Sequence, residues 1–150
     1  MKKEYLKLKE EFSLPDYDLL NDDFEIYTIS KEDNLIREII KKMSGVVDFY
    51  IDVLEDIIQP DSRFYTLKEA NVLNKDERRV VSLNYSKLMY LNRRNLEIHL
   101  DFSEAVGAEF ISNLFDEWQN IKKELLPIII KLKESWLIEQ DSKPVGGYFG

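Results

Sequence analysis

The stretch SKEDNLIREIIKKMSGVVDFYIDVLEDIIQ, residues 30–59, carries its apolar side chains at the spacing of an α-helix. At about 100° per residue, its isoleucine, leucine, valine and methionine side chains gather on one side, and most charged residues point the other way. A β-strand would require strict alternation, which this stretch lacks. We therefore expect a helix over residues 31–58, capped by Ser30 and stopped by Pro60, whose apolar stripe needs two or more neighbours to cover it.

Two residues interrupt the polar face of this helix. Gly45 costs about 1 kcal/mol relative to alanine in a helix interior, and Phe49 stands where a solvated helix should carry charge. We expect another part of the chain, the acidic segment of residues 13–29, to cover Phe49. The alternative is that Phe49 belongs to a surface that binds a partner.

Two further long helices follow in the sequence. Asn74 and Glu77 form a capping-box pattern that opens a helix over residues 75–100. A third helix is expected over residues 103–139, because its apolar positions keep one phase on both sides of Pro127, which indicates a kink and not a break.

The remaining segments complete an all-α fold. Residues 1–12 are expected to form a short charged helix, and residues 13–29 an irregular acidic strap across the others. Together with the three long helices, these segments predict an up-down bundle.

The chain is expected to form a single helical domain over residues 1–150. Residues 141–150, DSKPVGGYFG, contain a proline and two adjacent glycines, and this composition predicts a flexible tail. Tyr148 and Phe149 are unusual for a purely solvated tail. We therefore group them with Phe49 as candidates for a partner surface.

Composition and charge restrict the classes of partner. Apolar residues make up 44% of the chain and charged residues 33%, as is typical of a soluble globular protein. The chain has no cysteine, which favours a cytoplasmic location, and it has neither a signal-peptide core nor an apolar run that would span a membrane. The net charge of −8 makes nucleic acid an unsuitable partner. We expect the partner to be another protein, and the chain to be a monomer or a dimer.

The second helix places polar side chains on its apolar side. Tyr85 shares the side of Leu88, and Asn92, Asn95 and His99, the single histidine, fall within about 40° of Leu88. Buried amides and imidazoles must be hydrogen-bonded. The pattern therefore predicts either a polar network that fixes the helix register or a pocket lined by these groups.

The end of this helix leaves a further alternative. Residues 97–102, EIHLDF, also alternate as a strand would. If the helix ended before His99, the imidazole would not belong to this face.

Several chemistries lack their motifs in the sequence. There is no glycine-rich phosphate loop, and one histidine without any cysteine cannot form a His/Cys zinc site within one chain. The carboxylates of residues 13–29 do not follow the spacing of a calcium-binding EF-hand loop, which also needs a glycine that this segment lacks. We expect no metal and no cofactor, and we assign no catalytic residue.

The sequence therefore predicts a non-enzymatic protein–protein interaction or accessory module. The alternative is a small-molecule-binding or enzymatic helical bundle, with a polar site around Asn92, Asn95 and His99 and with Tyr85 beside it.

Overall fold

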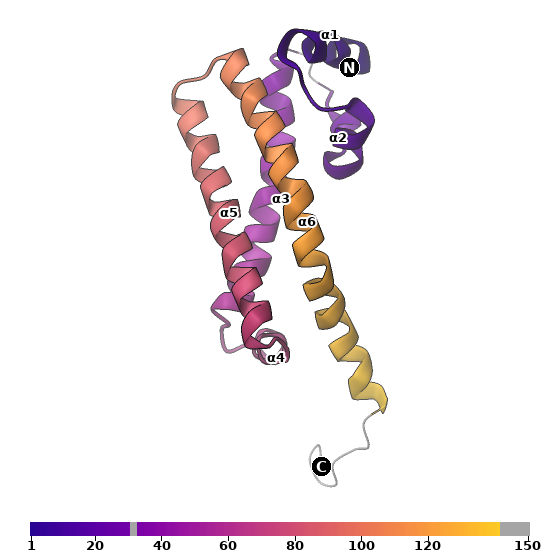
Figure 1. The fold of residues 1–150 in the computed structure, drawn as a ribbon, viewed down its shortest axis with the longest axis vertical. Coiled ribbons are helices and arrows are strands. Elements are labelled where there is room, and N and C mark those ends of the chain that lie inside the picture. Colours follow the sequence, from indigo (N-terminus) through magenta and orange to yellow (C-terminus); the bar gives the residue numbers. More distant parts are fainter. Residues whose placement is uncertain (31–32, 142–150) are drawn as a thin grey trace.

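Three long helices lie side by side in the computed structural model, which describes residues 1–30 and 33–141, with side chains through Leu137 (Figure 1). They are α3 (Leu35–Ile58), α5 (Lys75–Leu100) and α6 (Glu104–Asp141). The shorter elements are α1 (Lys2–Phe12), α2 (Tyr17–Phe24), the 3-10 turn η1 (Ile26–Thr28) and α4 (Phe64–Val72). The described residues contain no strand, and the predicted all-α bundle is confirmed.

Contacts between the long helices define an up-down arrangement. The side chain of Asn92 on α5 meets Asp48 on α3, and Tyr85 meets Glu55 one to two turns further along, so these two helices are antiparallel. Gly107 lies against Ile36 near the beginning of both α6 and α3, so α6 runs parallel to α3. The connection through α4 and the short loop between α5 and α6 thus bring the chain down, up and down again, as Figure 1 shows.

The beginning of α3 differs from the prediction. Asn34 adopts the left-handed conformation (φ 58°), and the helix starts after it, at Leu35. Ile29 is extended and buried, and Ser30 is exposed and does not cap the helix. The predicted start at residue 31 and the Ser30 cap are therefore wrong, because the left-handed residue interrupts the helical path.

The buried side chains of α5 and α6 repeat every seven residues, in alternating steps of three and four. This repeat averages 3.5 residues per turn, the period of helices that pack at a shallow crossing angle. On α6 the buried residues that follow this repeat are Gly107, Ile111, Leu114, Trp118, Ile121, Leu125, Ile128 and Leu132, and Ala108 and Phe110 are buried beside them. On α5 they are Val81, Asn84, Leu88, Leu91 and Ile98.

Two residues of α6 behave as the sequence indicates. The helix continues through Pro127, whose side chain is exposed, so the missing amide hydrogen falls on the solvated side. Gly107 is buried, and an added Cβ would lie 2.7 Å from Cγ2 of Ile36. A glycine is required there by the close approach of α3 and α6.

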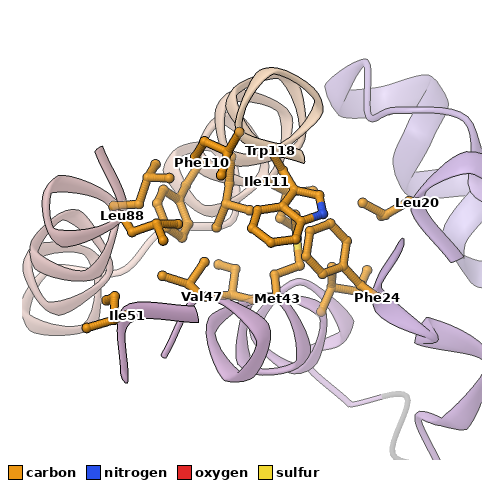
Figure 2. Packing of buried hydrophobic residues seen from close by; sticks show 14 of the residues in the cluster. Leu20, Phe24, Met43, Val47, Ile51, Leu88, Phe110, Ile111 and Trp118 are labelled. Atoms are coloured by element: carbon orange, nitrogen blue, oxygen red, sulfur yellow. The ribbon is translucent and has the colours of Figure 1, made fainter. Parts of the chain in front are cut away.

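The predicted irregular strap is mostly helical. The carboxylate of Asp16 accepts hydrogen bonds from the amides of Asp18 and Leu19 and so caps α2. Leu20 and Phe24 of α2 are buried, and Figure 2 shows Phe24 beside Met43 and Trp118. The prediction of irregular structure was wrong because this N-cap precedes an apolar pair four residues apart, a spacing that fits a helix.

Candidate functional site

The polar residues of α5 lie along its seam with α3. Nδ2 of Asn92 donates to the carboxylate of Asp48 (3.0 Å), and the Tyr85 hydroxyl donates to Glu55 (3.4 Å). Burial, followed by the nearby Glu55 carboxylate, raises the pKa of the Tyr85 phenol. These two contacts join the helices at a fixed register.

Asn95 and His99 lie further toward the end of α5. The Oδ1 atom of Asn95 is buried without a hydrogen-bond partner among the described residues, and so is Ser44 Oγ on the facing helix. His99 is exposed, and its Nδ1 lies 2.9 Å from the carbonyl oxygen of Asn95. The predicted inward position of His99 is wrong, although the helix does continue past it to Leu100.

The physical reason is the period of the seam. A helical wheel at 100° per residue places His99 near Leu88, but the 3.5-residue repeat buries Ile98 instead. The structure therefore connects Tyr85 and Asn92 to α3, buries part of Asn95, and leaves His99 at the surface. That these residues bind a ligand stays a prediction.

Phe49 is exposed on α3, with 60% of its surface accessible. Its ring stands edge-on to that of Tyr50, with ring centroids 5.2 Å apart. The expectation that the segment of residues 13–29 covers Phe49 is wrong, because α2 ends at Phe24, which packs on Trp118 and leaves the Phe49 ring exposed. Tyr148 and Phe149, the other predicted partner residues, lie outside the described residues, as does the tail beyond Asp141.

A depression of about 500 Å³ opens beside Phe49, where α2, α3 and α6 meet. Aromatic rings of Phe24, Phe49, Tyr50 and Trp118 line it, and Gly45 exposes helix backbone at its edge. Nothing lies within 4 Å of the position that a Cβ on Gly45 would take, so no packing contact in the described chain requires this glycine. The cost of a glycine inside α3 is thus unexplained by internal packing.

Charged groups close one end of this depression. The Asp23 carboxylate of α2 accepts hydrogen bonds from Nζ of Lys122 (2.6 Å) and from Nε2 of Gln119 (2.8 Å) on α6. On the α3 side, Lys42 is exposed and forms no salt bridge with a described residue. The aromatic surface is therefore bordered by Lys42 of α3 and Lys122 of α6, and by the carboxylates of Asp22, Asp23 and Glu25 on the α2 side.

A second, smaller depression lies further along the same pair of helices. It has a volume of about 230 Å³ and is lined by Val53 and Ile57 of α3, Leu132 of α6 and side chains of α4. Between the two depressions α6 carries Leu126, which is 60% exposed. Sequence reasoning missed Leu126, although the seven-residue repeat on α6 would have placed it outside the buried seam.

Within residues 1–30 and 33–141, no three His, Asp or Glu side chains lie close enough together to hold a metal ion. None of the described helices has the length and apolar character needed to cross a bilayer.

Comparison with protein-family models, with curated proteins and with solved structures found no match to this chain.

Proposed function

We propose that this protein is a non-enzymatic, cytoplasmic interaction module that binds another protein through the surface around Phe49. The observation that carries the proposal is the 60% exposure of Phe49 at the edge of a depression lined by three further aromatic rings. Aromatic side chains in concave apolar surfaces supply most of the binding energy at many protein interfaces.

Gly45 adds independent support to this proposal. A glycine in a helix interior lowers stability, and no contact within the described part of the chain requires Gly45. A partner that approaches the backbone of α3 closely would benefit from the missing side chain. The cytoplasmic location is proposed because the chain has no cysteine.

The proposal is tested by affinity capture from a lysate of the source organism, with the wild-type chain and two variants as bait. Phe49→Ala should abolish capture of at least one protein that the wild type retains. Tyr90→Ala is the matched control, because Tyr90 is 70% exposed on α5, away from the depression. Equal capture by the wild type and Phe49→Ala, or no specific capture by the wild type, would refute the proposal.

A further inference from the structure

We infer that the groove between α3 and α6 binds an amphipathic helix of the partner, with acidic residues on the flank that faces α6. This inference rests on the proposed function and adds the structure and chemistry of the partner segment. Helix α2 occupies one end of the groove, apolar residues lie exposed beyond α2, and charged residues stand at the rims.

Helix α2 shows what this groove accepts. Leu20 and Phe24, four residues apart, are 0% and 2% exposed, and Phe24 packs beside Trp118 with ring centroids 6.1 Å apart (Figure 2). Asp23, on the flank of α2, pairs with Lys122 of α6. The chain's own segment thus combines an apolar i, i+4 pair with a carboxylate directed at α6.

Between the end of α2 and α4, which itself packs against both α3 and α6, no described helix covers the side chains along this groove. Phe49 and Leu126, one on each side, are both 60% exposed, and Val53 and Ile129 are half-buried between them and the core. Depressions lie at both ends, one against α2 and one against α4. Figure 1 shows α1 and α2 beside the first half of α6 and not beside its second half.

The length of the open section fits a short helix. From Phe49 to Ile57 α3 rises by about 12 Å, which corresponds to slightly more than two helical turns. A helix of this length presents apolar side chains at positions i, i+4 and i+7 to a groove. Such spacing would place one side chain in each depression and one against Leu126.

Beyond the first depression, where Lys42 lies on the α3 side, the two rims of the groove carry opposite charges. Lys133 of α6 lies on the same side of that helix as Lys122 and Leu126, and it is exposed. Asp52 is exposed on the outer edge of α3 beside Phe49. Neither Lys133 nor Asp52 forms a salt bridge with a described residue. Charge complementarity therefore favours a helix with carboxylates toward α6, as Asp23 already illustrates.

The experiment uses the full chain with a photo-crosslinking amino acid, p-benzoylphenylalanine, at position 49, 126 or 90 in separate preparations. Each is irradiated in a lysate of the source organism, and crosslinked peptides are identified by mass spectrometry. The probes at positions 49 and 126 should link to the same segment of one partner protein. The crosslinked residues of that segment should be three, four or seven positions apart. The probe at 90, on α5, should not link to that segment.

A synthetic peptide of the identified segment then tests the charge assignment. Lys133→Glu should weaken its binding by about three- to tenfold, as measured by fluorescence anisotropy. Lys75→Glu is the matched control, because Lys75 is also exposed and forms no salt bridge with a described residue, but lies at the beginning of α5. The affinity of the Lys75→Glu variant for the peptide should change by less than about twofold.

Three results would overturn the inference. Links from both probes to a second copy of this chain would indicate self-association. The probe at position 49 could link to a partner segment with prolines at its centre, or to a segment that the probe at position 126 does not reach. Either result would refute the binding of a helix and leave the proposed function intact. Absence of links at position 49 would remove both.

Discussion

Two glycines of this protein occupy opposite environments in the long helices. Gly107 lies where α6 meets α3, with Ile36 Cγ2 2.7 Å from an added Cβ and Phe102 Cε1 3.0 Å away. Gly45 lies in open space on α3. The sequence places both in helices, but only the packing distinguishes the glycine that is needed from the one that is not.

This difference predicts opposite effects of the same substitution. Gly45→Ala should raise the free energy of unfolding by about 0.5–1 kcal/mol, because alanine favours the helix and meets no neighbour. Gly107→Ala should lower it by about 1 kcal/mol, because overpacking against the branched Ile36 side chain exceeds the gain in helix propensity. Urea unfolding of both variants measures the effect, and a shift of the same sign in both would contradict the packing described for α3 and α6.

The hydroxyl of Tyr5 anchors the N-terminal segment. It is fully buried and donates to the carbonyl oxygen of Pro15 at 2.6 Å. Tyr5→Phe should lower the free energy of unfolding by about 1 kcal/mol, because the partly buried Pro15 carbonyl loses its donor. Leu6→Ala, a change at a neighbouring exposed position of α1, is the control and should have a smaller effect.

The same tyrosine predicts a loss of stability in alkali. Burial, and to a smaller extent Asp16, raises the pKa of the Tyr5 phenol above its usual value of about 10. The folded state therefore keeps the proton that the unfolded chain releases. The contribution of the Tyr5 hydroxyl to the free energy of unfolding is complete below the pKa of the unfolded chain, and it declines as pH rises above about 10. Tyr5→Phe should show a weaker decline over this range in urea unfolding, and an identical decline would contradict the burial of this group.

At the scale of an element, the beginning of α5 combines a cap with a link to α6. Glu77 accepts from the backbone amide of Asn74 (2.9 Å), and Lys131 donates to the same carboxylate at 2.6 Å. The Lys131 contact first, and the Asn74 amide second, lower the pKa of Glu77. A carboxylate with a lowered folded pKa stabilises the protein above its unfolded pKa, and this contribution is lost as pH falls through the folded pKa.

Glu77→Gln should therefore reduce stability at neutral pH by less than about 1 kcal/mol, because the pair is partly exposed and screened by solvent. The difference from the wild type should vanish as pH falls through the lowered folded pKa of Glu77, where the carboxylate of the wild type is protonated as well. Glu117→Gln on α6, which removes an exposed carboxylate with no salt bridge to a described residue, is the control. A stability difference that persisted unchanged at low pH would contradict the assigned role of the charge.

The elements also show how far a sequence can be interpreted. The capping box of α5, the passage of α6 through Pro127 and the buried side of Gly107 all follow from local patterns. His99 was misplaced because a wheel at 3.6 residues per turn drifts from a seam that repeats every 3.5 residues. The error grows with distance from the reference residue, so Asn92, near Leu88, was placed correctly beside α3 and His99 was not.

At the scale of the whole molecule, the exposure of Phe49 depends on where the segment of residues 13–29 runs across the helices. The sequence indicates that residues 13–29 lie across the bundle, and Leu20, Phe24 and Ile26 do so. Where that segment ends relative to α3 is a tertiary property with no local signature. The surface around Phe49 therefore could not be predicted from the sequence, because it is formed by the packing of α2, α3 and α6 against one another.

The central claim is that the surface around Phe49 binds a partner protein. The most direct measurement is the dissociation constant of the captured partner, obtained from the fluorescence of Trp118, which lines the depression, with Trp136 replaced by phenylalanine. In this background, Phe49→Ala should weaken binding by at least about tenfold, or 1.4 kcal/mol. The urea midpoint should change little, because most of the Phe49 surface is already exposed. An unchanged dissociation constant would contradict the claim.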